Sequence, residues 1–226
     1  MKLTPDMLTG KSREHLVNLP TPHSPHHFLQ AQAMKAFQGL QQRAVNNGFN
    51  LQPASSFRDF ARQQLIWNGK FNGERKVHDD AGNALDLSRL DDWQKAQAIL
   101  RWSALPGASR HHWGTEIDIF DPDLLPQGQS LQLEPWEYEK GGYFFELSEF
   151  LTENLPHFDF SLPFMQMPAE KKIGREPWHI SYVPLAEQAA KTFTPEVLLR
   201  AWEKEEIAGK NALTPHLPEI FAQFFI

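Results

Sequence analysis

Two segments far apart in the chain carry residues suited to metal-dependent chemistry. The first is SRHHWGTEID at 109–118, and the second is REPWH at 175–179. A hydrolytic zinc site needs three nitrogen or oxygen ligands, an open position for water, and a carboxylate that takes a proton from that water. The residues of the right type are His111, Asp118 and His179 as candidate ligands, and Glu176 as candidate general base.

Each of these residues also has an ordinary structural interpretation. His111 and its neighbour His112 could be loop residues, Asp118 a solvated strand residue, and His179 a buried histidine with satisfied ring nitrogens. The chain has no cysteine, so any metal must be held by His, Asp or Glu. Pro177 discourages a helix interior, so a site carried by strands is favoured over a helical one.

The elements that must position these residues are visible in the local pattern. Ile117 and Ile119 alternate with polar residues in the segment EIDIF, which predicts a strand with one buried face. Asp118 then points away from the hydrophobic layer. Gly114 allows the backbone to turn, so that the side chains of His111 and Asp118 converge.

The remaining pattern predicts an α+β fold with a small antiparallel sheet flanked by helices, because helices and strands alternate without a regular βαβ order. We expect a single domain over 1–226, with an extended N-terminal arm (about 1–27) and a C-terminal helical extension (about 185–226). The loop 121–142 is too long for a simple turn and could cover a cleft. Helices are expected at 28–45, 59–67, 90–100, 143–154, 195–206 and 218–225, and further strands at 49–57, 158–164 and 178–183.

Composition excludes several classes of protein. Hydrophobic residues make up 41% of the 226 residues, which is typical of a globular protein rather than a disordered one. The formal net charge is −6, from 22 basic and 28 acidic residues, so nucleic acid is an unfavoured partner. No apolar run approaches the ~20 residues that a membrane-spanning helix requires. The oligomeric state is left open.

The motifs resemble the zinc D-alanyl-D-alanine carboxypeptidases of the VanY type and their peptidoglycan endopeptidase relatives, which share the Hedgehog/DD-peptidase fold. The pattern SxHxxGxxxD begins at Ser109 and is followed by EPWH, which ends at His179. Upstream, SSFR at 55–58, with Gln63 five residues after its arginine, is similar to that family's SGYR segment. Three motifs in the expected order are far more specific than any one of them.

The resemblance implies a role for each matched residue. It places one zinc ion on His111, Asp118 and His179, with Glu176 as catalytic base. Arg58 would face the substrate carboxylate or the developing oxyanion. Further substrate contacts are expected from Ser109, Gln63 and Trp178, and Trp113 could also wall the cleft, whereas Trp67, Trp93, Trp102 and Trp202 are expected in the core.

The activity expected from this resemblance is zinc-dependent D-alanyl-D-alanine carboxypeptidase action on peptidoglycan-type peptides. A peptidoglycan endopeptidase, a D-Ala-D-Ala dipeptidase and a non-catalytic zinc-containing binder of cell-wall peptides are alternatives, and Glu176 argues against the binder. One position departs from the family, which usually has a small residue, often alanine, where this chain has Glu116. Because Glu116 leans to the Asp118 face, we expect it to crowd or acidify the pocket.

Two features near the N-terminus give weaker expectations. Residues 1–19 have neither the apolar run nor the cleavage site of a secretory signal. The location is left open: cytoplasmic for the chain as given, or periplasmic if it has been trimmed. His23, His26 and His27 are possible metal ligands, but they are more simply loop residues of a proline-rich arm.

Overall fold

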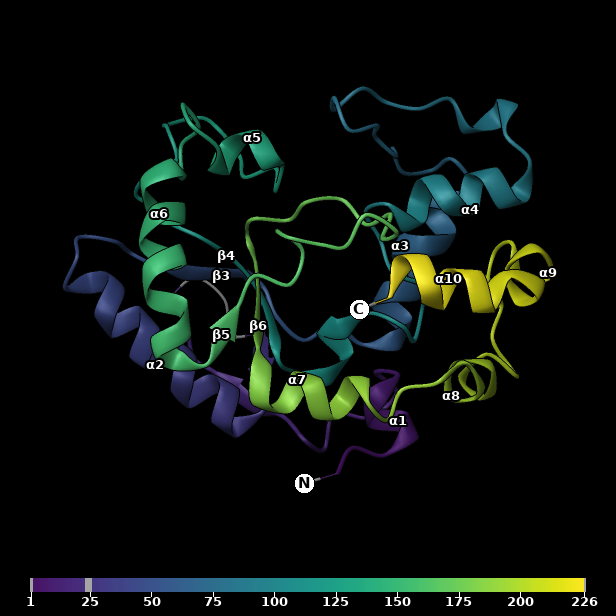
Figure 1. Ribbon diagram of the computed structural model, residues 1–226, viewed down its shortest axis with the longest axis horizontal. Helices are drawn as coiled ribbons and strands as arrows, with labels where there is room; N and C mark the ends of the chain where they lie inside the picture. The colour runs from purple at the N-terminus through teal and green to yellow at the C-terminus, as the bar shows by residue number, and fades with distance from the viewer. Residues whose placement is uncertain (1, 23–25, 226) are drawn as a thin grey trace.

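Figure 1 shows the computed structural model, which describes residues 2–22 and 26–225. The described residues form an α+β fold with two separate antiparallel sheets, neither of which closes on itself. The larger sheet has the strand order β3-β4-β6-β5 and the smaller one pairs β1 with β2. The strands are β1 (Val17–Leu19), β2 (His27–Leu29), β3 (Gln52–Ser55), β4 (Glu116–Phe120), β5 (Phe160–Ser161) and β6 (His179–Tyr182).

The helices begin where side chains or prolines favour it. Asp59 caps the helix α3 (Phe60–Phe71) by accepting a hydrogen bond from the Arg62 backbone N–H. Asp91 and Gln94 form a capping box at the start of the helix α4 (Asp92–Leu100). A short 3-10 turn, η2 (Arg110–Trp113), precedes β4. The helices are α1 (Pro5–Leu8), α2 (Ala31–Val45), α3 (Phe60–Phe71), α4 (Asp92–Leu100), α5 (Pro135–Tyr138), α6 (Phe145–Asn154), α7 (Val183–Ala190), α8 (Pro195–Ala201), α9 (Lys210–Leu213) and α10 (Leu217–Phe224). None of the described helices is long and apolar enough to cross a membrane.

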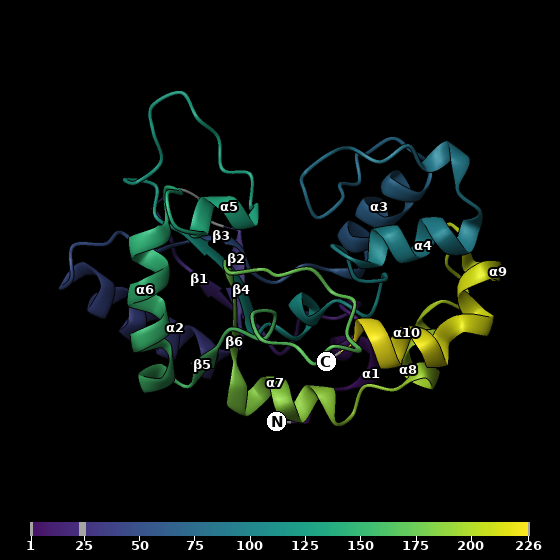
Figure 2. The same cartoon turned by 45° about the horizontal axis from the view of Figure 1, so that its top comes forward.

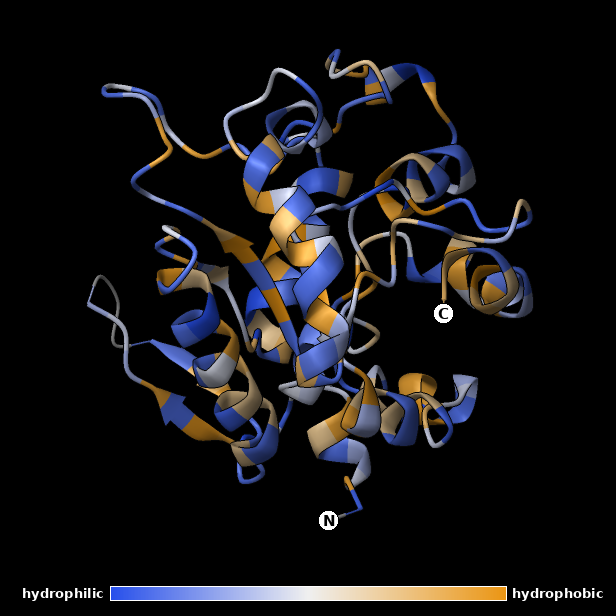
Figure 3. Cartoon of the chain, turned by 60° about the vertical axis from the view of Figure 1, so that its left-hand side comes forward, coloured by the Kyte–Doolittle hydropathy of each residue, from blue (hydrophilic) through white to orange (hydrophobic). Residues whose placement is uncertain are grey.

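Two hydrophobic cores lie on either side of the site. In the first, Ile117, Ile119 and Ile180 of the larger sheet pack with buried residues of α2 and α6, such as Phe37 and Leu147. Figure 3 shows hydrophobic and hydrophilic residues mixed along these elements, as expected when each element buries one face. The opposite face of the sheet is therefore left for polar side chains.

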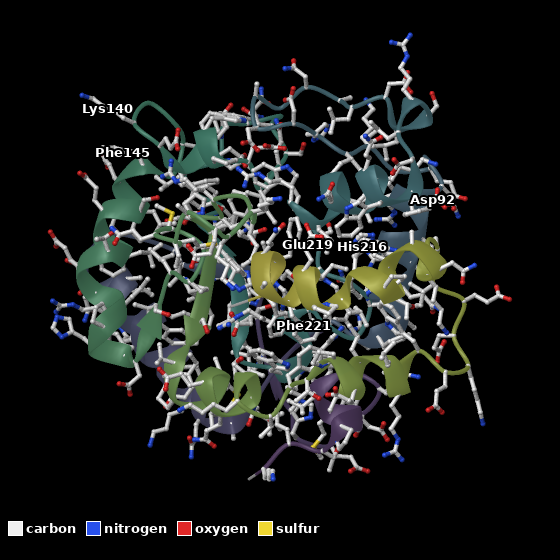
Figure 4. The ribbon with its side chains drawn as sticks, turned by 45° about the vertical axis from the view of Figure 1, so that its right-hand side comes forward. Asp92, Lys140, Phe145, His216, Glu219 and Phe221 are labelled. Carbon is white, nitrogen blue, oxygen red and sulfur yellow. The ribbon has the colours of Figure 1, made fainter. Side chains whose placement is uncertain are left out.

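The second core is helical and surrounds two fully buried indoles, Trp67 and Trp202. The C-terminal helix α10 is fixed to it by ring contacts: His216 stacks on Trp93 of α4 with ring centroids 4.0 Å apart, and Phe221 stacks on Phe193 at 5.6 Å. Figure 4 shows His216 at the start of this helix, as its N-cap, and Phe221 within it. The burial of Trp67 and Trp202 agrees with the sequence prediction.

The N-terminal segment differs from the expected extended arm. Residues 5–8 form helix α1, capped by Thr4, and 17–19 pair with 27–29 as a two-stranded sheet. His27 therefore lies in a strand rather than a loop, and its Nδ1 is 3.0 Å from Ser56 Oγ. His23 lies outside the described residues. The first long helix starts at Ala31 instead of residue 28, because 27–29 are taken by the strand pairing.

Two other element predictions need correction. The strand expected at 158–164 is only Phe160–Ser161, because Phe158 ends a 3-10 turn and Pro163 has no N–H for the ladder. The prediction of separate helices near the C-terminus omitted α7, which begins directly after β6 with Pro184 in its first turn. The strand predicted at 116–120 agrees with β4.

Gly114 connects η2 to β4 in a left-handed conformation, with φ 68°. A Cβ atom there would lie 2.2 Å from Leu16 Cδ2 and 3.2 Å from the Gln30 backbone nitrogen. Gly128 has a similar φ of 82°, but no atom lies within 4 Å of a Cβ placed on it. A side chain at either glycine would therefore strain the left-handed backbone, but only one at Gly114 would also clash with neighbouring atoms.

We expect Gly114→Ala to lower the free energy of unfolding by about 2–5 kcal/mol, the sum of about 1–2 for the left-handed backbone and about 1–3 for overpacking. Gly128→Ala should cost only the backbone contribution. Urea unfolding of the two variants and the wild type measures the difference. Equal losses in both variants would show that the contacts at Leu16 and Gln30 do not constrain this turn.

Candidate active site

The antiparallel pairing of β4 with β6 brings the two motifs together. Asp118 lies directly opposite His179, and Glu116 lies opposite Ser181. Because side chains alternate along a strand, these four residues share one face of the sheet, and the isoleucines between them face the first core. Two residues 61 positions apart in sequence thus become neighbours in space.

The three candidate metal ligands lie close together. His111 projects from η2 with its Nε2 atom 3.3 Å from Asp118 Oδ2. His179 Nδ1 is 3.0 Å from Asp118 Oδ1. One ligand atom from each of the three residues lies within 4.8 Å of the others, and all three residues are buried. This trio is the group that the sequence predicted.

Each histidine is oriented by a hydrogen bond at its other ring nitrogen. His111 Nδ1 is 2.7 Å from the Ser56 carbonyl oxygen, so Nδ1–H donates and Nε2 is available toward Asp118. His179 Nε2 is 2.7 Å from Glu116 Oε2, which leaves the other ring nitrogen, Nδ1, directed at Asp118. Two imidazole nitrogens and one carboxylate form the N/O donor set of catalytic zinc sites. The residues present therefore fit a metal cofactor.

Glu116 lies on the Asp118 face of the sheet, as expected from the sequence, but it does not reach the cavity. Its side chain is fully buried behind His179, and it is absent from the residues that line the cavity. Burial alone raises the pKa of this carboxyl, but the Arg110 charge and the hydrogen bonds from His179 and Ser181 outweigh it and hold the pKa at about 2. The prediction that Glu116 crowds the pocket is thus wrong, because its carboxylate is hydrogen-bonded to His179 and Ser181 behind the cavity wall.

A cavity of about 400 Å³ opens in front of the three ligands. Ser109 and Trp178 line it, and so do residues 132–134 of the loop that was expected to cover a cleft. Figure 2 shows the segments 121–134 and 72–86 on opposite sides of the upper part of the molecule. His78 Nδ1 lies 3.5 Å from Glu134 Oε1, so these two segments meet at the cavity.

Glu176 reaches the cavity from the chain just before β6. Its Oε2 atom is 3.6 Å from His179 Nδ1, and the side chain remains partly exposed to the cavity. Burial raises the pKa of Glu176 to about 7, with the Asp118 charge adding to this effect and the His179 and Arg58 charges opposing it. A carboxyl with this pKa can both accept and return a proton near neutral pH.

The charges of Asp118 and His179 stabilise each other. Burial by itself raises the pKa of Asp118, but His111 and His179 outweigh it and hold that pKa well below its usual range. Burial also lowers the pKa of His179, yet its hydrogen bonds with Asp118 and Glu116 raise the pKa to about 9. Asp118 is therefore an anion, ready to pair with a cation at this position.

Arg58 faces Asp118 from the adjacent strand pairing, since Ser55 of β3 lies opposite Asp118. Its Nη2 is 3.9 Å from Asp118 Oδ2 and donates to Ser55 Oγ at 3.3 Å. Its Nη1 donates to Gln63 Oε1 at 2.8 Å, and Gln63 Nε2 donates to the Ala104 carbonyl. Gln63 is fully buried, so the structure places it behind Arg58 rather than on the cavity wall as a substrate contact.

Sequence reasoning missed or misplaced several residues at the cavity. Lys70 lines it from α3, with Nζ donating to Ser103 Oγ at 2.7 Å, and burial lowers the pKa of this amine. Its spacing of seven from Gln63, two helical turns on one face, was the available signal. Trp102, expected in the core, lines the cavity. Trp113, expected at the cleft, is buried against Phe193 in the helical core.

Comparison with protein families gives one match that covers most of the chain. The family model described as VanY, D-alanyl-D-alanine carboxypeptidase, matches residues 26–185. Two uncharacterized proteins of Haemophilus influenzae are similar in sequence. One is 70% identical over 122 residues, covering 54% of this chain and 93% of the relative. The other is 83% identical over 105 residues, covering 46% of this chain and 72% of the relative.

Solved structures share the fold at low sequence identity. VanYB in complex with D-alanine-D-alanine has a TM-score of 0.52 and 22% identity, covering 86% of this chain and 92% of its own. The LdcB LD-carboxypeptidase has a TM-score of 0.55 and 17% identity, and the match covers 84% of this chain and 80% of LdcB. A VanY D,D-pentapeptidase mutant in complex with Zn(II) has a TM-score of 0.50 and 22% identity, and the match covers 88% of this chain and 91% of the mutant's chain. At these identities the likeness establishes the fold.

We expect the wild-type protein to bind close to one metal ion per chain, and His179→Ala to lose it, because two ligands rarely hold a catalytic metal. Metal content after dialysis, measured by elemental analysis, checks this. The matched control is His157→Ala, which removes an exposed histidine of the 3-10 turn at Leu155–Phe158, outside the candidate ligand group. A His179→Ala protein that keeps a full equivalent of metal would show that the ion is bound elsewhere.

Proposed function

Because the chain belongs to the VanY family of D-alanyl-D-alanine carboxypeptidases, we propose that it is a zinc-dependent carboxypeptidase that removes the terminal residue from peptidoglycan-type peptides ending in D-Ala-D-Ala. The observation that carries this proposal is the convergence of the His–Asp–His trio, Glu176 and Arg58 on one cavity. Two structures with this fold, one bound to D-Ala-D-Ala and one to Zn(II), support the choice of substrate and metal.

His111, Asp118 and His179, which all line the cavity, would hold the zinc ion. When bound, zinc would supply Lewis-acid chemistry, polarising the scissile carbonyl and a water molecule. Glu176 is the partly exposed carboxylate beside this site, with Oε2 3.6 Å from His179 Nδ1. It takes the proton of the attacking water and later returns it to the leaving amine.

Arg58 supplies a fixed positive charge on the opposite wall. Its guanidinium is held by Gln63 and Ser55, so little side-chain entropy is lost when it binds a second anion. A guanidinium can grip a carboxylate with two parallel hydrogen bonds, or it can stabilise the oxyanion that forms during attack. Lys70, Lys76 and Arg110 also line the cavity, and this basic lining suits a peptide with a free carboxyl terminus.

The proposed activity is tested by mass-spectrometric digestion of a pentapeptide stem ending in D-Ala-D-Ala. We expect wild type to release a single terminal alanine and to lose this activity when zinc is removed. Glu176→Gln should keep its metal and its fold but lower kcat by about 10²- to 10⁴-fold, because an amide cannot accept the proton of water. The control is Glu187→Gln, which alters an exposed carboxylate on α7.

The outcomes of this digestion separate the related activities. Cleavage inside the stem would identify an endopeptidase, cleavage of free D-Ala-D-Ala alone a dipeptidase, and binding without cleavage a cell-wall peptide binder. Each of these results would contradict the carboxypeptidase proposal. A Glu176→Gln variant within about tenfold of the wild-type kcat, about 1.4 kcal/mol in barrier height, would exclude Glu176 as the base.

Arg58→Lys distinguishes the two roles of the guanidinium, because an ammonium cannot reproduce its paired hydrogen bonds. If Arg58 grips the terminal carboxylate, wild type should strongly prefer a free C-terminus over its amide, and the lysine variant should lose much of that preference. If it serves the oxyanion, kcat should fall by a similar factor for both substrates. Steady-state kinetics with the paired peptides measures this, and wild-type kinetics in the variant would exclude both roles.

A further inference from the structure

The metal ligand His179 has a buried carboxylate behind it. Glu116 Oε2 is 2.7 Å from His179 Nε2, on the side of the ring away from the candidate metal position. A carboxylate can only accept a hydrogen bond, so the Nε2 proton must point at it. A metal at Nδ1 uses the lone pair of that nitrogen, which leaves the remaining ring proton on Nε2. The observed contact is therefore the one required in the metal-bound state.

The other oxygen of Glu116 is held by separate groups. Thr115 Oγ1 donates to Oε1 at 2.9 Å, Ser181 Oγ at 2.8 Å and Arg110 Nη2 at 3.3 Å. Arg110 also donates to Ser181 Oγ at 2.9 Å, which closes the network. The carboxylate is thus fixed through Oε1, while Oε2 is reserved for His179. Glu116 is also fully buried, so water does not compete for either oxygen.

The imidazole ring itself is packed on two sides. The Phe164 ring lies edge-on at 4.6 Å between centroids, and the His111 ring lies edge-on at 4.9 Å. These contacts limit rotation of the ring but do not distinguish its two flipped orientations, in which Nδ1 exchanges places with Cδ2 and Nε2 with Cε1, because the exchanged atoms are similar in size. The hydrogen bond with Glu116 selects the orientation that is present, because a flipped ring would place Cε1 instead of Nε2 against the carboxylate.

We propose that Glu116 is a positioning residue for the metal site, which holds His179 with Nδ1 directed at the metal and strengthens that nitrogen as a ligand. The inference rests on the proposed function, since it requires a metal on His111, Asp118 and His179. A carboxylate behind a histidine ligand fixes the tautomer and ring orientation and raises the basicity of the metal-binding nitrogen. His111 has only the neutral Ser56 carbonyl in the equivalent position, so His179 is the ligand with the charged support.

Glu116→Gln removes the charge at almost constant volume. An amide has one acceptor oxygen and one donor NH₂, whereas His179 Nε2–H and Arg110 Nη2–H both donate to Glu116, each to a different oxygen. One of these two donors would therefore face the amide NH₂ and lose its hydrogen bond. We expect the zinc dissociation constant, measured by competition with a chromophoric chelator, to rise about tenfold to a hundredfold. Glu116→Asp keeps the charge but withdraws it from Nε2 by one methylene, and we expect a loss of similar size.

The matched control is Glu137→Gln, the same substitution at another fully buried glutamate. Glu137 accepts hydrogen bonds from the Gln132 and Glu134 backbones and contacts none of the candidate ligands, so its zinc affinity should equal that of wild type. A second measurement reports on His179 directly. In zinc-loaded wild type the Nε2 proton should give a slowly exchanging imidazole N–H signal by NMR, and this signal should be lost or shifted in Glu116→Asp.

The results separate this inference from the proposed function. If wild type binds zinc and both Glu116 variants bind it within about threefold of wild type with an unchanged N–H signal, Glu116 has a purely structural role and the inference is overturned. Urea unfolding of each variant shows whether such a role exists. If wild type itself binds no zinc, the proposed function fails, and the inference fails with it.

Discussion

The antiparallel pairing of β4 with β6 constrains every other part of the site, because it sets Asp118 opposite His179. A slip of one residue would turn the isoleucines of both strands toward the cavity and bury the ligands in the hydrophobic core. The core on the far side of the sheet prevents that slip. Ile117, Ile119 and Ile180 are fully buried there, so their hydrophobic burial also specifies the chemistry on the opposite face.

Two further connections attach Arg58 and His111 to this pair of strands. On the other edge of β4, strand β3 pairs with it so that Ser55 lies opposite Asp118, and this pairing places Arg58, three residues after Ser55, at the cavity. The Ser56 carbonyl then orients His111, which reaches the site through the left-handed turn at Gly114. A rigid framework of this kind holds the donor atoms close together before any metal binds, which reduces the reorganisation that binding requires.

The chemistry was predictable where it depended on short segments. The strand 116–120 followed from the alternation of two isoleucines with acidic residues, and the ligand trio followed from residue type and motif order. The orientation of Glu116 and the placement of Gln63 were not predictable, because both depend on partners more than forty residues away, Ser181 and Ala104. Helix periodicity marked Trp102 as apolar but could not show that it faces a cavity.

The prediction of an extended N-terminal arm was wrong for a similar reason. The pairing of 17–19 with 27–29 is a tertiary feature that no local pattern reports. None of these differences moves a candidate ligand, because all three ligands lie on or beside the two central strands.

Anomalous diffraction from zinc-soaked crystals, with data collected on both sides of the zinc absorption edge, locates the metal without reference to activity. The structure predicts a single strong peak per chain, bounded by His111 Nε2, Asp118 and His179 Nδ1, that vanishes below the edge. A chain without a peak at this position, or with its strongest peak on another set of residues, would contradict the assignment of the two central strands as the metal-binding centre.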